Sequence, residues 1–107
     1  MGLAPTSKRA QLFVESLVKD GAIENNIFAF SLGKNDEPSS ITIGGYEPAG
    51  NVVPGTPIVW HKLVDVDYWS LNFNNPTVGS LPIQTNIKKM IVDTGTSFNL
   101  VPASDYQ

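Results

Sequence analysis

Apolar residues recur at the spacing of a helix only near the start of the chain. Three of them fall on one face of such a helix: Leu12, Phe13 and Leu17. Thr6 or Ser7 can cap the start, and Gly21 can adopt the left-handed conformation that ends a helix. We therefore predict one amphipathic helix at about residues 6–20.

After the helix the pattern changes to short apolar or alternating runs bounded by turn residues. These runs predict strands at 27–32, 40–43, 58–63, 68–73, 81–85 and 88–92. The first two flank a turn cluster at 33–38 and predict an antiparallel hairpin. Residues 102–107 resemble the first turn of a second helix. The sequence therefore predicts a mainly β fold with antiparallel strands and one helix.

The composition agrees with a mainly β fold and excludes several other classes of protein. The length of 107 residues corresponds to about one domain. Apolar residues make up 41% of the chain and charged residues 16%, a composition too apolar for a disordered chain and too lightly charged for a coiled coil. Nine Gly and eight Pro disfavour long helices. No apolar run approaches the length of a membrane span, so we expect no membrane partner.

The charge and the reactive residue types limit the possible chemistry. A net charge of -3, with basic pairs only at Lys8-Arg9 and Lys88-Lys89, argues against nucleic-acid binding. The absence of Cys and the presence of one histidine, His61, lead us to expect no metal and no cofactor. Asp65 and Asp67 alternate along a chain segment, which favours a solvated face over a metal site. Carboxylates must therefore carry any catalysis.

The most informative local signal is an acid in a tight turn, Asp93, which follows three apolar residues. Gly95 allows a tight backbone reversal. A carboxylate at the end of a buried strand needs donors, which Thr94, Thr96, Ser97 and the N–H groups after Gly95 supply. A carboxylate of this kind is a candidate for a tuned pKa. The alternative is an inert Asp that caps its own turn at a strand end.

The segment Ile91–Ser97 resembles the second active-site motif of pepsin-like aspartic peptidases, the A1 family of pepsin and cathepsin D. Further segments resemble parts of that family in the family's order: the tail of an apolar-apolar-Gly loop at 1–5, its helix through 18–23, a hairpin at 28–32 and 41–45, and a Tyr-Trp strand at 68–71. The resemblance covers nearly all of the chain.

The resemblance implies a bilobal β enzyme of which this chain is an internal fragment, incomplete at both ends. Residues at about 1–45 correspond to the end of the N-terminal lobe and the crossover, and those at about 46–107 to the crossover and the start of the C-terminal lobe. The first Asp-Thr-Gly motif, the flap and the rest of the second lobe are absent. We therefore expect an inactive isolated chain, with the missing lobe segments of the parent chain as its partners. Leu81–Lys89 lacks the disulfide that many relatives carry, an accessory bridge.

The resemblance also assigns roles at the motif. Asp93 would be the second-lobe acid of a dyad that shares one proton and activates a water to attack a peptide bond. Thr94 would brace the loop against the other lobe. Gly95 and Thr96 would hydrogen-bond the substrate backbone or the outer carboxylate oxygen, and Ser97 the substrate main chain. The substrate would be a peptide or protein.

Tyr68 carries a weaker implication. The resemblance places it along a pocket on the leaving-group side, although a tyrosine packed in a strand pair fits equally. The segment itself does not fix a compartment. By resemblance, the parent protein would follow the secretory pathway to a lysosome, a vacuole or the exterior.

Three other interpretations stay open at this point. A non-catalytic pepsin-like binding protein would keep the cleft and lack the first-lobe acid. A retrovirus-type peptidase would form its dyad by homodimerisation, but only twelve residues follow Gly95, too few for that design. In the third, the motif is a coincidence in an independent β domain.

Overall fold

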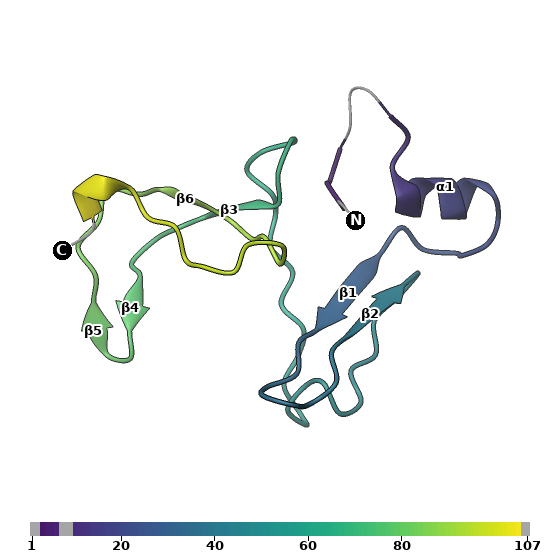
Figure 1. Cartoon of the computed structure of the whole chain (residues 1–107), viewed down its shortest axis with the longest axis horizontal. Helices are drawn as coiled ribbons and strands as arrows, with labels where there is room; N and C mark the ends of the chain where they lie inside the picture. The colour runs from purple at the N-terminus through teal and green to yellow at the C-terminus, as the bar shows by residue number, and fades with distance from the viewer. Residues whose placement is uncertain (1–2, 7–9, 106–107) are drawn as a thin grey trace. The chain divides into compact units, whose positions relative to one another are not determined.

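A computed structural model describes residues 3–6 and 10–105 (Figure 1). The chain forms two compact units, one from Met1–Leu3 and Ser7–Trp60 and the other from Ala4–Thr6 and His61–Gln107. Within the described residues, one α-helix accompanies short strands whose pairings are all antiparallel. The predicted mainly β fold with one helix is therefore confirmed.

Helix α1 of the first unit spans Phe13–Lys19. Leu12 has an extended backbone, with φ -72° and ψ 141°, and its carbonyl accepts a hydrogen bond from the Ser16 hydroxyl at 3.0 Å. Val14 is the buried residue of the helix. The helix is thus shorter than predicted at its start, because the chain is still extended at Leu12. The Thr6 hydroxyl donates to the Val66 carbonyl instead of capping the helix, and Ser7 and the pair Lys8-Arg9 lie outside the described residues.

The end of α1 follows the prediction. Gly21 has a φ of 71°, in the left-handed region. Its N–H donates to the Val18 carbonyl at 3.0 Å, and the Ala22 N–H donates to the Leu17 carbonyl at 2.9 Å. These two bonds form a Schellman motif, which satisfies carbonyls that a helix end leaves without partners. Gly21 therefore ends the helix by its backbone conformation.

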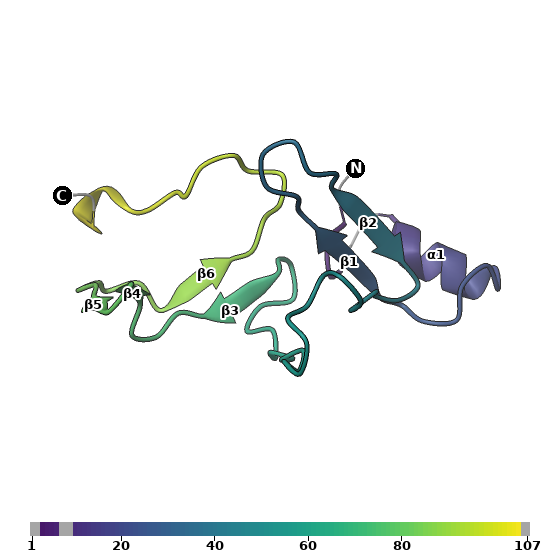
Figure 2. The same ribbon diagram turned by 90° about the horizontal axis from the view of Figure 1, so that it is seen from below.

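The predicted hairpin is formed by β1, Phe28–Ser31, and β2, Ser40–Ile43. Their register pairs Phe28 with Ile43 and Ser31 with Ser40, and Figures 1 and 2 show the two strands side by side. The ladder continues where the Gly44 N–H donates to the Ile27 carbonyl at 2.7 Å. The connecting loop is closed by side chains, because the Gly33 N–H donates to the Ser39 hydroxyl and the Lys34 N–H to the Glu37 carboxylate.

The predicted strand at 58–63 is wrong, because that segment forms no strand. Val59 and Trp60 are about two-thirds exposed, at 67% and 68%. Trp60 instead makes an edge-to-face contact with Tyr46, with ring centroids 6.0 Å apart. A β-prone run without a neighbouring strand has no ladder to join, so composition alone misassigned it.

In the second unit, β3, Ser70–Asn72, pairs with β6, Lys89–Ile91. Hydrogen bonds from the Val92 N–H to the Trp69 carbonyl and from the Phe73 N–H to the Lys88 carbonyl, both 2.9 Å, extend the ladder at each end. The strands predicted at 68–73 and 88–92 are therefore present, with shorter bounds.

The remaining elements of the second unit are small. The strand predicted at 81–85 is reduced to β5, Leu81–Pro82, which pairs with β4, Thr77–Val78, a strand that the sequence pattern did not predict. The predicted helical turn is a 3-10 turn, η1, at Ala103–Asp105, and its last two predicted residues lie outside the described part. Across the described ranges, the helices are too short and too polar to cross a bilayer.

Little of the described chain is buried. Val14 is the buried apolar residue and Ser70 the buried polar one, while large side chains such as Phe98 and Leu100 are about four-fifths exposed, at 79% and 82%. The elements are therefore held largely by backbone ladders and by polar contacts within each unit.

Candidate active site

The β3–β6 ladder of the second unit sets the position of Asp93. The last recorded bond of that ladder joins Val92, the residue before Asp93, to Trp69. Asp93 therefore begins the turn that leaves β6, and its backbone direction is fixed by the strand pair.

Two donors from the same turn hold the Asp93 carboxylate. Its Oδ1 accepts from the Gly95 N–H at 2.9 Å, and its Oδ2 accepts from the Thr96 hydroxyl at 2.6 Å. The Thr96 N–H also donates to the Asp93 carbonyl at 3.4 Å, which closes the turn. The Thr96 hydroxyl first, and then the Gly95 N–H, lower the pKa of Asp93 because hydrogen bonds to a carboxylate favour its ionised form.

The surroundings of Asp93 differ from the expectation in two respects. The strand before it is not buried in this chain, since Ile91 is 55% and Val92 48% exposed. Of the expected donors, only Thr96 and the Gly95 N–H bond the carboxylate; neither Thr94 nor Ser97 does. Asp93 is therefore an exposed carboxylate with one side-chain and one backbone donor.

Gly95 has a different role from the one expected. Its φ is not in the left-handed region, so the reversal itself does not require glycine. A Cβ at this position would lie 3.2 Å from Oδ1 of Asp93, closer than about nine in ten real Cβ contacts. Glycine therefore leaves room for the carboxylate beside the N–H of residue 95, and a Cβ there would require the Asp93 side chain to shift by a few tenths of an ångström.

Tyr68 lies near the same end of the ladder. Its carbonyl accepts from the Ser70 N–H at 2.8 Å, and its side chain is 58% exposed. The last hydrogen bond of that ladder joins Val92 to Trp69, so Tyr68 and Asp93 both lie just beyond its end. The two hydrogen bonds of the Asp93 carboxylate come from Gly95 and Thr96, and neither involves Tyr68.

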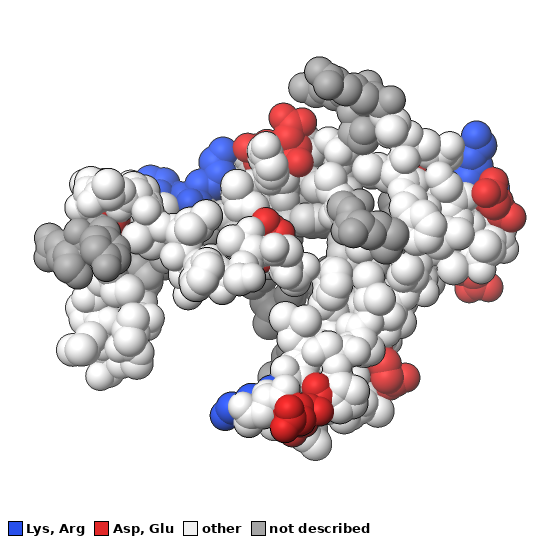
Figure 3. Space-filling model, in the orientation of Figure 1, with Lys and Arg blue, Asp and Glu red and all other residues white. Residues whose placement is uncertain are grey.

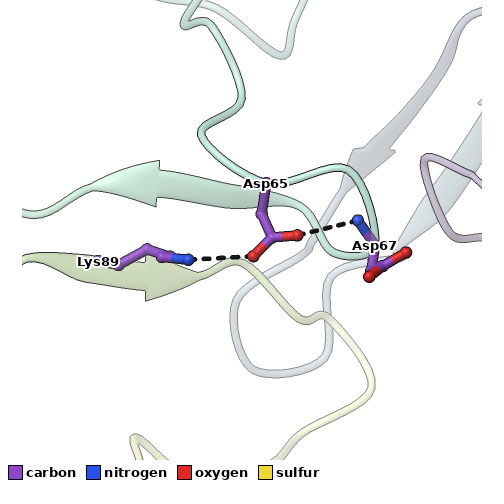
Figure 4. Close-up of polar contacts among 3 residues, drawn as sticks. All are labelled: Asp65, Asp67 and Lys89. Atoms are coloured by element: carbon purple, nitrogen blue, oxygen red, sulfur yellow. Dashed lines mark hydrogen bonds and ion pairs between the residues drawn. The ribbon is translucent and has the colours of Figure 1, made fainter.

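Two further carboxylates of this unit, Asp65 and Asp105, form polar contacts that the sequence analysis did not predict. Asp65 pairs with Lys89 of β6 at 3.0 Å and accepts from the Asp67 N–H at 3.1 Å (Figure 4). Asp105 accepts from the hydroxyls of Thr85 and Ser104. The Asp-x-Asp spacing at 65–67 is typical of an Asp side chain that caps its own turn, and that signal was available in the sequence.

The charged side chains form no single patch on the face seen in Figure 3. On the face seen in Figure 3, acidic and basic side chains are scattered among uncharged ones. Within residues 3–6 and 10–105, no three His, Asp or Glu side chains gather in a way that could hold a metal ion.

Comparison with known proteins assigns the family. Residues 1–107 match the family model described as eukaryotic aspartyl protease. A mainly β chain that carries an Asp-Thr-Gly turn at the end of an antiparallel ladder is consistent with that match. The chain belongs to the eukaryotic aspartyl protease family.

Individual relatives are similar at low identity. Vacuolar protease A of Arthroderma otae is 29% identical over 91 residues, which cover 82% of this chain and 22% of that protein. Napsin-A of Mus musculus is 28% identical over 96 residues (86% and 22%), and Aspartic protease 3 of Toxoplasma gondii 24% over 94 residues (85% and 14%). The matched part of the chain thus spans between about a seventh and a little over a fifth of the length of these relatives.

Proposed function

We propose that this chain is part of an aspartic endopeptidase, in which Asp93 is the second-lobe acid of a catalytic pair. The observation that carries the proposal is the Asp93 carboxylate, exposed at the end of the β3–β6 ladder and held by the Gly95 N–H and the Thr96 hydroxyl. Membership of the aspartyl protease family supports it. The substrates would be peptides or proteins.

The contacts of Asp93 fit the role of a base toward water. Its two donors favour the ionised form, which can accept a proton from an attacking water. A second carboxylic acid close to it would remain protonated, because two nearby carboxylates do not ionise together easily. That second acid would donate to the oxygen of the scissile carbonyl while the water attacks its carbon.

The second acid of the pair would come from polypeptide outside these 107 residues, because the sequence contains a single Asp-Thr-Gly. On this proposal, residues at about 1–45 belong to the end of the first lobe and the crossover, and those at about 46–107 to the crossover and the start of the second lobe. The 107-residue chain alone would not cleave peptides.

The residues after Asp93 would contact the substrate. Thr96 and Ser97 are both exposed, and the Thr96 hydroxyl and the Gly95 N–H contact the carboxylate. Gly95 and Thr96 would hydrogen-bond the peptide main chain or the outer carboxylate oxygen, and Ser97 the peptide main chain. Thr94 would brace the loop against the other lobe. Tyr68, more than half exposed at the same end of the ladder, would line the pocket on the leaving-group side.

The test compares the complete gene product with its Asp93→Asn variant in a peptide-cleavage assay. Asparagine keeps the shape and one acceptor oxygen for the Gly95 N–H, but its amide nitrogen cannot accept from the Thr96 hydroxyl, and the amide cannot take a proton from water. We therefore expect a loss of roughly 10²- to 10⁴-fold in kcat. Asp36→Asn, an exposed acid in the β1–β2 loop, is the matched control and should retain full activity.

Two results would overturn the proposal. Cleavage that survives Asp93→Asn would show that this carboxylate is not catalytic. A complete gene product that binds peptides without cleaving them would identify a binding protein of the same family.

A further inference from the structure

An ion pair links β6 to the turn before β3 (Figure 4). Oδ2 of Asp65 lies 3.0 Å from Nζ of Lys89, and the two side chains are 29% and 51% exposed, respectively. Asp65 comes from the turn and Lys89 from the first residue of the strand that leads to Asp93. The sequence pattern gave neither residue a functional role.

The same carboxylate also shapes the turn. Oδ1 of Asp65 accepts from the Asp67 N–H at 3.1 Å, while the Val64 N–H donates to the Ser70 carbonyl at 3.0 Å. The turn therefore closes onto β3 at Ser70, which is only 1% exposed. One carboxylate thus joins the turn that starts β3 to the strand that pairs with β3.

Strand β6 depends on few other contacts for its position. In the described part of the chain it pairs with β3 alone, over three residues, and all three of its residues are exposed. The Val92–Trp69 bond, one residue before Asp93, is the end of that short ladder. A contact that holds β6 against the turn therefore also holds the segment from which the Asp93 turn departs.

We infer that Asp65, acting through Lys89, is a positioning residue that holds β6 and thereby the Asp93 turn in place. The inference rests on the proposed function of Asp93 for its catalytic consequence. Its structural part is that the Val92–Trp69 hydrogen bond depends on the ion pair. This dependence can be measured without an assay of cleavage.

The contact requires the ionised form of Asp65. The Asp67 N–H first, and then Lys89, lower the pKa of Asp65 below its ordinary value of 3.8. A lowered pKa means that the contact is present above the ordinary value and is lost as pH falls through the lowered one. Asp67 in the same turn and Lys89 on β6 are the charged groups next to Asp65 among the described residues, since β3 contains only Ser, Leu and Asn.

The experiment uses the complete gene product with three single variants. Lys89→Gln removes the charge that faces Asp65, and Asp65→Asn removes the carboxylate charge but keeps an oxygen for the Asp67 N–H. Lys88→Gln is the matched control, because Lys88 is the neighbouring lysine and makes no recorded ion pair. A chemical denaturation curve for each variant checks that it is folded.

The primary measurement is amide hydrogen exchange at Val92 and Gly95 above the ordinary pKa of Asp. An exposed ion pair has a modest effect, so Asp65→Asn and Lys89→Gln should each speed exchange by about two- to fivefold, and Lys88→Gln should not. The differences in exchange rate between these variants and the unsubstituted protein should vanish at a pH where its Asp65 is protonated. A substitution that merely disturbed the local structure would speed exchange at that pH as well.

Unchanged exchange at Val92 in Asp65→Asn, or an equal change in Lys88→Gln, would overturn the inference whether or not the protein cleaves peptides. Cleavage is measured in parallel, where kcat should fall with the same pH dependence and KM should stay constant. The cleavage data test the proposed function of Asp93. If cleavage does not depend on Asp93, the catalytic consequence of the ion pair is lost, but the exchange data still test whether the ion pair holds β6 in place.

Discussion

The two units of the chain are stabilised by different kinds of contact. The first contains a four-pair hairpin and a helix that ends in a Schellman motif. The second contains shorter strand pairs and the three carboxylates whose pKa is lowered: Asp65, Asp93 and Asp105. Each of the three is held by hydroxyl or N–H donors, and Asp65 also by a lysine. The three carboxylates with a lowered pKa therefore lie in the unit that carries Asp93, although Glu37 and Glu47 of the first unit also accept backbone N–H bonds.

This difference has a physical consequence. Backbone ladders and glycine-dependent turns do not change when a carboxyl group is protonated, whereas a hydrogen bond to a carboxylate weakens. The first unit should thus be sensitive to the space around its glycines, and the second to pH. Four predictions test this contrast.

The largest expected change in stability comes from Gly33→Ala in the first unit. A Cβ at residue 33 would lie 2.3 Å from the Glu37 carbonyl oxygen, a contact that requires the backbone of the loop to move. We expect the free energy of unfolding to fall by about 2–3 kcal/mol in a urea titration. Gly45→Ala is the control, because a Cβ there meets nothing within 4 Å and its φ is not positive. Equal losses in both variants would show that the loop does not need glycine at residue 33.

The second prediction concerns acid. The pKa of Asp65, Asp93 and Asp105 is lowered in the folded chain, so their contribution to stability is complete above the ordinary pKa of Asp and is lost as pH falls through the lowered values. Amide signals of Val92, Gly95 and Asp105 should therefore change in acid before those of the paired strand residues of β1 and β2, Phe28–Ser31 and Ser40–Ile43. Simultaneous loss of both sets of signals would contradict the contrast between the units.

The third prediction isolates the side-chain donor at the site. Thr96→Val removes the hydroxyl that lowers the pKa of Asp93 most, so that pKa should rise toward its ordinary value. Thr96→Ser keeps the hydroxyl and should leave the pKa unchanged. The loss of cleavage in Thr96→Val should be smaller than in Asp93→Asn, because the carboxylate itself remains. An Asp93 titration that is identical in the Val and Ser variants would eliminate Thr96 as its donor.

The smallest effect is expected at Ser70. Its hydroxyl is buried and has no recorded hydrogen-bond partner. An unsatisfied buried polar group is unfavourable, so Ser70→Ala should be neutral or stabilising by up to about 1 kcal/mol in the same urea titration. A clear loss of stability would mean that the hydroxyl has a partner in the folded protein.

The sequence predicted those features that depend on neighbouring residues. The stop at Gly21 and the hairpin around 33–38 follow from backbone preferences and turn residues, which act locally. The run at 58–63 has strand-like composition but no partner strand, and whether a partner exists is not a local property. Strand β4 was missed because it has only two residues, too few for an alternating pattern.

The same division holds at the candidate site. The position of the acid and its set of possible donors were predicted from the motif, but only the folded turn selects Thr96 and the Gly95 N–H from that set. The Asp65–Lys89 pair joins residues that are 24 positions apart, so no periodicity could reveal it. It depends on the β3–β6 register, which is a tertiary property.

The most direct test of the central claim is the titration of the Asp93 carboxyl group in the complete gene product, followed by NMR of its carboxyl carbon. A proton shared with a second acid predicts two titration steps, one of them above the ordinary pKa of Asp. A single step below the ordinary value, as the Thr96 and Gly95 donors alone would give, would contradict the claim that Asp93 is half of a catalytic pair.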